Sequence, residues 1–467
     1  METLQRTANA GSVSTGFDID NSLKFEADNS EYLSWSDVTS YATDARKRTW
    51  SISFWCKRTE IGVQQLPWNS GGNGTLAFQA ADHLNFQQFF SDSASAAKYL
   101  NTNRLFRDPS AWYHIIIAID TTQSTEAHRM RLYVNGEEET SFASTVYPPQ
   151  NATATDIYGS YISLGRSLNW GAGFSGYIAN YYLISEVQLV PTDVGEYDED
   201  SGIWKPKAYA GAITAPSTFL EFKDSSNFKT ATSGLDATVS SNLTAADQAT
   251  DTPTNNFATY NALLPYADVR EGATRFFNHD AGADMNLSTV AVANGKWYAE
   301  FKTPSDISGG NGQYGVHANE GSITDGRFIG QDAWSCGPMG GTNYYRIGNV
   351  NSSAYFGSTW GQNDIMSVAL DMDNKKVYFA KNGTWGNSGN PATGTNGIAL
   401  PSAYEDYEWF IGASLVLHTA TFNANYGGYT TNTISSAASD ANGYGTFEYA
   451  PPSGYYALCT KNLAEYG

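Results

Sequence analysis

The strongest constraint on the fold is a β-hairpin pattern that occurs twice, in residues 112–136 and 364–383. In each copy an apolar segment ends in Asp, a polar break follows, and a second apolar segment that carries a Tyr ends in Asn-Gly. A tight hairpin turn needs positive φ at its central positions, and Asn and Gly tolerate positive φ better than other residues. The repeated pattern therefore predicts two antiparallel β domains in one chain.

Composition supports a β-rich chain. Aromatic residues make up 14% and charged residues only 16% of the 467 residues, and 44 residues are glycine. Aromatic side chains suit pleated surfaces, whereas long helices favour Lys, Glu, Leu and Ala. The formal net charge of −20, without any basic stripe, excludes nucleic acid as a partner because binding it depends on neutralising phosphates with Lys and Arg. The acidity also keeps a Tyr-rich protein soluble.

The cysteine pattern and the hydropathy pattern bear on location. The three cysteines are far apart and odd in number, so we expect neither a disulfide framework nor a Cys-based metal site, and we expect synthesis in a reducing cytoplasm. Residues 1–20 are polar and predict no signal peptide. The longest aliphatic run, residues 115–119, is far short of the roughly 20 residues that a spanning helix needs, so we expect no membrane insertion.

Alternation of apolar and polar residues locates the expected strands. Residues 50–57 and 113–119 each place apolar side chains on one face, and 132–134 follow as a hairpin partner. In the second copy, 366, 368 and 370 share a face that 377 and 379 would meet across the hairpin. Only residues 94–99 suggest a turn of helix.

The expected fold class is all-β, with two antiparallel jelly-roll sandwiches joined by a long, partly ordered connector. The expected division is an N-terminal arm (1–14), a first sandwich (15–190), a connector with short strands (191–287), a second sandwich (288–428) and a C-terminal strap (429–467).

Several motifs carry a resemblance to known families. The first module is similar to laminin-G-like, concanavalin A-like domains in residues 22–25 with 32–33, 50–55, 111–114, 132–136 and 174–178. The second resembles a SPRY domain in residues 295–298, 364–383 and 422–427. With the linking residues 202–207 and 251–257 and the C-terminal 455–462, the whole resembles a two-domain family of tailed-bacteriophage virion proteins of the tail fibre, head fibre or decoration type.

This resemblance implies a virion protein that is assembled in the host cytoplasm and contacts other capsid or tail proteins. No heptads and no repetitive shaft occur before the first sandwich, which favours a short fibre, a fibre tip or a decoration protein. Virion appendages are commonly trimeric, and Tyr-rich faces of low charge suit subunit contacts, so we expect a homotrimer.

Acidic motifs offer little for catalysis. Some jelly rolls of this type hydrolyse glycosides with two carboxylates that face each other across the sugar. Residues 196–200 (Glu-Tyr-Asp-Glu-Asp) lie beyond the strand pattern and are expected to form a solvated turn, and Asp371 and Asp373 sit at a hairpin turn where they would accept N–H bonds. The six histidines show no metal-ligand spacing. We therefore expect no enzyme and name no catalytic residue.

Two kinds of binding residue stand out. Laminin-G-like domains often bind calcium through Asp side chains, so Asp120 and Asp156 are candidate Ca²⁺ ligands, with turn capping as the favoured alternative. Aromatic residues in Gly- and Asn-rich loops are candidate ligand-binding residues because sugar C–H faces stack on Trp and Tyr; the alternative is that they plug the sandwich end or an oligomer interface. These candidates are Trp170, Tyr344, Tyr345 and Trp360, whereas Trp50, Trp112 and Trp297 are expected in the core.

Three functions follow from the sequence. The first is a virion appendage whose lectin-like domains bind a host-surface polysaccharide or another host receptor. The second is a purely structural decoration protein that stabilises the capsid or tail. The third, less favoured, is a polysaccharide depolymerase.

Overall fold

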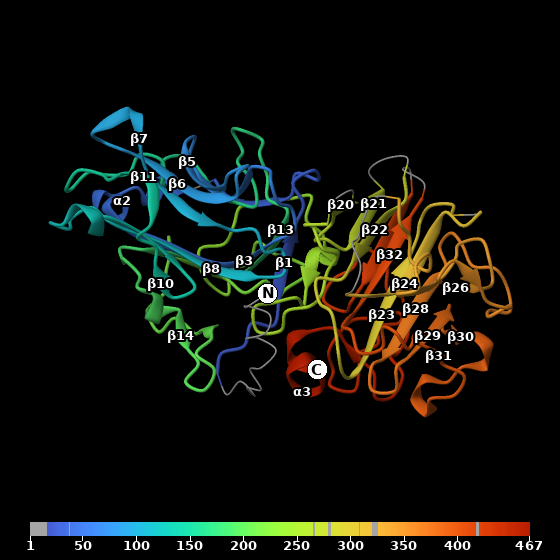
Figure 1. Cartoon of the computed structure of the whole chain (residues 1–467). Helices are drawn as coiled ribbons and strands as arrows, with labels where there is room; N and C mark the ends of the chain where they lie inside the picture. The colour runs from blue at the N-terminus through green and yellow to red at the C-terminus, as the bar shows by residue number, and fades with distance from the viewer. Residues whose placement is uncertain are drawn as a thin grey trace. The chain divides into compact units, whose positions relative to one another are not determined.

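The computed structural model describes residues 16–467 except 37, 265–266, 279–281, 308, 320–325 and 417–419 (Figure 1). The expected arm 1–14 therefore lies outside the described residues. Two compact units meet in sequence between Thr254 and Asn255. Nearly all regular structure is antiparallel strand, which confirms the predicted all-β jelly-roll sandwiches. In the described part of the chain, no helix is long and apolar enough to cross a membrane.

The first unit, Ser12–Thr254, is built on two sheets (Figure 1). The nine-stranded sheet contains β1 (Ser22–Phe25), β3 (Thr49–Arg58), β8 (Trp112–Asp120), β9 (Met130–Val134), β10 (Glu137–Glu138), β13 (Gly176–Ser185), β16 (Thr218–Leu220), β17 (Ser233–Gly234) and β19 (Gln248–Ala249). The eight-stranded sheet contains β2 (Tyr32–Trp35), β4 (Gln65–Ser70), β5 (Gly74–Phe78), β6 (His83–Phe90), β7 (Ser93–Leu105), β11 (Phe142–Val146), β12 (Ile162–Leu164) and β18 (Val239–Ser241). The only α-helix in the described part of this unit is α2 (Asp44–Arg48).

Aromatic side chains join the two sheets into a sandwich. Trp50 of β3 stacks on Trp68 of β4, with 5.8 Å between ring centroids, and Phe86 of β6 contacts both rings. Trp50 and Trp112 are buried, which confirms their predicted core positions. Each large side chain removed from water contributes about 1.5–3 kcal/mol. Residues 94–99 belong to β7, so the helical turn expected there is wrong: pairing with β6 overrides the local Ala-rich preference.

The outer face of the larger sheet is covered by the hairpin of β14 (Gly195–Tyr197) and β15 (Trp204–Pro206). Trp204 donates its indole N–H to Nδ1 of His114 (3.0 Å). The first Asn-Gly turn lies against it: Asn135 and Gly136 have φ of 50° and 85°, and a Cβ on Gly136 would come within 2.5 Å of the Trp204 ring. The Asn135 side chain accepts the His114 backbone N–H (2.7 Å). The first Asn-Gly turn is thus fixed by the Trp204 ring at Gly136 and by the hydrogen bond between Asn135 and His114.

The second unit, Asn255–Gly467, also contains two sheets (Figure 1). The nine-stranded sheet contains β20 (Ala267–Arg270), β21 (Arg275–Asn278), β23 (Lys296–Lys302), β28 (Ile365–Asp371), β29 (Lys376–Lys381), β30 (Thr384–Trp385), β31 (Ile398–Ala399), β33 (Thr421–Asn425) and β34 (Tyr456–Ala457). The six-stranded sheet contains β22 (Asp284–Leu287), β24 (Gly312–Ala318), β25 (Ser335–Pro338), β26 (Tyr345–Ile347), β27 (Val350–Asn351) and β32 (Trp409–Leu415). The helix α3 (Thr460–Tyr466) ends the chain.

The second hairpin has the predicted register. Val368 pairs with Phe379 and Leu370 with Val377 across β28 and β29. All four side chains are buried, and so is Trp297 of β23, which was expected in the core.

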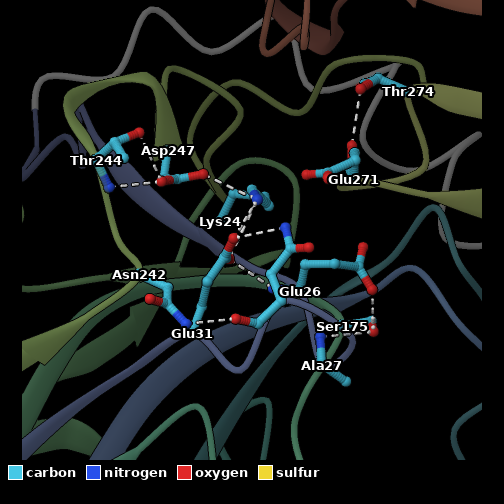
Figure 2. Close-up of polar contacts among 11 residues, drawn as sticks. Lys24, Glu26, Ala27, Glu31, Ser175, Asn242, Thr244, Asp247, Glu271 and Thr274 are labelled. Atoms are coloured by element: carbon cyan, nitrogen blue, oxygen red, sulfur yellow. Dashed lines mark hydrogen bonds and ion pairs between the residues drawn. The ribbon is translucent and has the colours of Figure 1, made fainter.

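Residues between the two expected sandwiches are divided between the units. Strands β14 to β19 belong to the first and β20 to β22 to the second. Within the first unit two aspartates of this segment neutralise buried lysines. Asp247 lies 2.8 Å from Lys24 of β1, which also meets Glu31 at 3.0 Å (Figure 2), and Asp251 lies 2.8 Å from Lys57 of β3. Burial raises the pKa of Glu31, and Lys24 partly offsets that effect.

The C-terminal segment 429–467 is held to the second unit by buried carboxylates. Glu300 of β23 accepts the backbone N–H groups of Glu448 (2.9 Å) and Tyr449 (2.8 Å). Within the segment, Asp440 accepts the Ala457 N–H and an Asn462 side-chain N–H and so joins its two halves. Strand β34 then pairs with β23 in parallel. Charged hydrogen bonds of this kind fix a chain segment that has little regular structure of its own.

Candidate functional site

Trp170 is an exposed aromatic residue of the first unit. It lies in a short hairpin loop that is closed by the bridge between Arg166 and Gly173 and by the bond from the Ser167 N–H to the Ala172 carbonyl (2.9 Å). The Ser167 hydroxyl also accepts the Trp170 N–H (3.3 Å). Trp170 is 52% exposed, and its indole contacts no other ring in the described part of the chain. The loop therefore presents a large apolar surface to solvent on a closed backbone.

Tyr344, Tyr345 and Trp360 of the second unit have other positions. Trp360 is 1% exposed and packs edge-on against Tyr314, with 5.1 Å between centroids, so its predicted role as an exposed ligand-binding residue is wrong. Tyr344 and Tyr345 are half-buried. The Tyr345 ring stands perpendicular to that of Tyr355 at 5.3 Å. Both tyrosine side chains are therefore only partly accessible to solvent.

A cavity of about 580 Å³ beside the second Asn-Gly turn was not expected from the sequence. Two segments line it, 355–358 and 381–388. The available signal was Trp385, which follows the Asn-Gly turn by two residues in a Thr-Trp-Gly sequence. The segment that faces this turn precedes β28, so the two walls come together only in the folded chain.

The acidic residues considered for catalysis are engaged in turns. Asp198 caps the turn of the β14–β15 hairpin by accepting the Ser201 N–H and hydroxyl (2.9 Å each), and these bonds lower its pKa to about 2. Asp371 accepts the Asn374 N–H (2.9 Å) and Asp373 accepts the Gly295 N–H (2.8 Å). The prediction of a turn N–H bond is confirmed for Asp371, whereas Asp373 binds an N–H that lies 78 residues away in the sequence. The solvated turn expected at 196–200 is wrong for Glu196 and Tyr197, which pair with β15 as part of β14.

The two candidate calcium ligands accept hydrogen bonds from protein groups, Asp120 within its own turn and Asp156 from the distant strand β6. Asp120 accepts the Thr122 N–H and hydroxyl and the Gln123 side chain, which together lower its pKa. Asp156 accepts from Gln88 and from the Phe89 N–H, each at 3.3 Å, and burial raises its pKa to about 6. Among the described residues no three His, Cys, Asp or Glu side chains gather as a metal site would require. Turn capping by Asp120 is confirmed.

His114 is the most enclosed of the described histidines. It lies between Trp55, which stacks at 4.6 Å, and Trp204, and its Nε2 is 2.8 Å from the Ser53 hydroxyl. Because Nδ1 accepts the indole N–H, the ring is neutral with its proton on Nε2. Burial lowers its pKa to about 3. A histidine held in this way supports the fold and has no access to substrate.

Comparison with known proteins adds a family match for the first unit. The laminin G model described as "Concanavalin A-like lectin/glucanases superfamily" matches residues 19–193. This match confirms the laminin-G-like assignment of the first sandwich. A search of curated proteins found no match.

Solved structures with similar folds include SPRY domains. The SPRY domain of human HERC1 has a TM-score of 0.27 and 15% identity, covering 34% of this chain and 91% of that one. A human SPRY domain has a TM-score of 0.26 and 12% identity, and the match covers 34% of this chain and 94% of that one. The native heptameric SAP-like pentraxin from Limulus polyphemus has a TM-score of 0.26 and 15% identity, and the match covers 38% of this chain and 80% of that one.

Proposed function

We propose that the chain is a virion appendage of a tailed bacteriophage, a short fibre, fibre tip or decoration protein, that binds a host-surface polysaccharide or another host receptor. One observation carries the binding role. Trp170, 52% exposed on a closed hairpin, belongs to the domain that matches the concanavalin A-like lectin model.

The chemistry of the Trp170 loop suits a sugar. An indole presents a flat apolar face against which the C–H groups of a pyranose can pack, while polar neighbours bind the hydroxyls. Arg166 and Asn169 precede Trp170 in the same loop, and the Arg166 guanidinium donates to the Ala27 carbonyl (3.3 Å). A closed hairpin lowers the ordering cost of binding because the loop backbone is already fixed.

The phage assignment rests on the resemblance of the sequence motifs. Within that proposal the chain contacts other capsid or tail proteins, forms a homotrimer, and binds neither nucleic acid nor membrane. Light scattering at micromolar concentration tests the trimer. A mass of three chains is expected, and a monomer would refute that part of the proposal.

The structural alternative, a decoration protein without host ligand, is favoured by one feature. The edge strand β11 has five residues and no charge, whereas the other strands at the sheet ends of the described chain have two to four residues. Three of its five residues, Ala143, Ser144 and Val146, are exposed. Uncharged edge strands pair readily with other chains.

We propose no catalytic role. A depolymerase would need two carboxylates on opposite sides of the scissile bond, roughly 5–10 Å apart. The carboxylates of Asp198 and Asp371 instead accept N–H bonds within turns, and that of Asp373 accepts the Gly295 N–H. Release of reducing ends from host polysaccharide would overturn this part of the proposal.

The binding role is tested with the full chain on a microarray of bacterial polysaccharides and purified lipopolysaccharides. Trp170→Ala should weaken binding about tenfold, since an aromatic contact contributes about 0.5–1.5 kcal/mol and 1.4 kcal/mol is a factor of ten. Tyr197→Ala is the matched control, an aromatic that is 49% exposed elsewhere in the same unit. Absence of any binding by the wild-type chain, or equal binding by Trp170→Ala, would refute the proposal.

A further inference from the structure

The cavity beside the second Asn-Gly turn has two walls from separate parts of the second unit. One is the segment 355–358, and the other is the end of β29 with the turn and β30, residues 381–388. The walls are joined by backbone bonding, since the Asn387 N–H donates to the Tyr355 carbonyl (2.7 Å). Its volume of about 580 Å³ lies in the range of roughly 300–1,000 Å³ that small-ligand sites occupy.

Aromatic side chains supply the apolar part of the lining. Tyr355 and Phe356 are each 5% exposed and stand nearly perpendicular, 5.0 Å apart. Trp385 is half-buried and meets Tyr378 edge-on at 6.5 Å. Gly386 lets the backbone approach these rings, because a Cβ there would come within 2.0 Å of the Tyr355 ring. Three rings on two walls thus border one small space.

The polar groups of the lining fall into two sets. Asn382, Lys381, Ser358 and Tyr355 are used internally. Asn382 bonds to the Ile365 N–H and to Asp364, and Lys381 donates to the Thr359 carbonyl and the Ser358 hydroxyl and lies 3.3 Å from Asp364. The Tyr355 hydroxyl accepts the Phe379 N–H (3.2 Å). The remaining set has exposed side chains that make no hydrogen bond within the described part of the chain. It consists of Thr384, Asn387 and Ser388.

The charge of the lining is balanced. Lys381 is the only ionisable side chain besides Tyr355 among the lining residues, and Asp364 neutralises it. A ligand with a net charge would find no counter-charge there. The free groups are one amide and two hydroxyls, which both donate and accept hydrogen bonds.

The backbone of one wall is held in an uncommon conformation. Asn387 and Ser388 have φ of 51° and 55° in succession, a region that non-glycine residues seldom enter. Bonds from Asn396 to the Asn387 carbonyl (3.1 Å) and from the Gly389 N–H to the Gly386 carbonyl (2.8 Å) fix it. Such strain concentrates at ligand-binding segments because the surrounding structure must maintain it.

We propose that this cavity is a second, independent ligand site that binds a neutral saccharide. The sugar packs a C–H face on the aromatic lining that includes Trp385, and its hydroxyls bond to Thr384, Asn387 and Ser388. We expect a neutral ligand because the charge of Lys381 is already paired with Asp364. The amide and hydroxyl groups of the lining both donate and accept hydrogen bonds, which suits the hydroxyl groups of a sugar. An extended peptide is the competing ligand, and the limited volume of about 580 Å³ favours the smaller molecule.

The test uses the full chain in a Trp170→Ala background, so that binding through the first unit is weakened about tenfold. A neutral oligosaccharide microarray should retain signal in this background. Trp385→Ala should then lower affinity at least tenfold. Gly357→Phe should do the same by filling the cavity, because space is open around the Gly357 Cβ position and the variant should fold normally. Tyr407→Ala, an aromatic that is 41% exposed in the same unit, should change nothing.

The outcomes separate the two proposals. Loss of all saccharide binding in Trp170→Ala alone would refute the second site and support the first. Full binding in Trp170→Ala with loss in Trp385→Ala and Gly357→Phe supports the second site and refutes the first. Binding that both cavity variants leave unchanged refutes the second site, as does a cavity-dependent signal that appears only on an array of neutral peptides.

Discussion

The buried pair of Lys57 and Asp251 gives the sharpest stability prediction. The two side chains are 0% and 1% exposed, their charged atoms are 2.8 Å apart, and the Trp112 indole N–H also donates to Asp251 (3.2 Å). Asp251→Asn keeps the volume and the acceptor for Trp112 but removes the negative charge that Lys57 faces. Removing one partner of a buried pair costs about 3–5 kcal/mol. The first unit should therefore lose about that much stability.

Urea unfolding followed by tryptophan fluorescence measures this loss. With an m-value of about 3 kcal/mol/M, the midpoint of the first unit should fall by about 1–2 M. The matched control is Asp44→Asn, which removes the exposed pair with Arg48, where Asp44 is 74% exposed, and should cost below about 0.5 kcal/mol. Replacing both partners, Lys57→Met with Asp251→Leu, should recover most of the loss. An Asp251→Asn midpoint within 0.2 M of wild type would refute the reasoning.

Three further predictions concern single residues. Asp156 has a pKa raised to about 6, so the folded chain holds a proton that the unfolded chain releases near pH 4. The free energy of unfolding should therefore fall by about 2–3 kcal/mol as pH rises from 4 to 6. Asp156→Asn should flatten that part of a Tm-against-pH profile, and parallel profiles for the two chains would contradict the prediction. Gly383 has a φ of +75° and lies against the Tyr449 ring, so Gly383→Ala should lower the free energy of unfolding in urea by at least about 1–2 kcal/mol. The control Gly357→Ala, with open space around it, should lower it by almost nothing. Equal urea midpoints for the two variants would contradict the need for glycine at this turn. Trp360→Ala should cost about 3–5 kcal/mol by calorimetry, and a change below 1 kcal/mol would show that the indole is not in the core.

The strands that carry strong apolar alternation could be predicted, and the others could not. Strands β3, β8, β23, β28 and β29 contain large apolar residues at alternate positions, and each Asn-Gly turn joins the second strand of its predicted hairpin to a short further strand, β9 to β10 and β29 to β30. The sheet of β4 to β7 was missed because Gln, Asn, Ser and Ala fill its solvent face. Strand β6 did carry a signal, since residues 84, 86, 88 and 90 are buried in alternation.

The candidate site was predicted only in part. Trp170 could be found because an exposed turn surrounds it in sequence as well as in space. Trp360 has a similar Gly- and Thr-rich surrounding, yet its indole packs on Tyr314 and Phe422, which lie far away in the sequence. A loop's composition does not determine which way its aromatic residue points. The cavity shows the same limit, because the segment 355–358 and the turn after β29 meet only in the folded chain.

The most direct test of the proposed adhesion is retention of the full chain on beads coated with bacterial surface polysaccharide. The wild-type chain should be retained and should elute with free neutral oligosaccharide, while the double variant Trp170→Ala and Trp385→Ala should pass through. Failure of the wild-type chain to be retained on any polysaccharide, or equal retention of the double variant, would contradict the account.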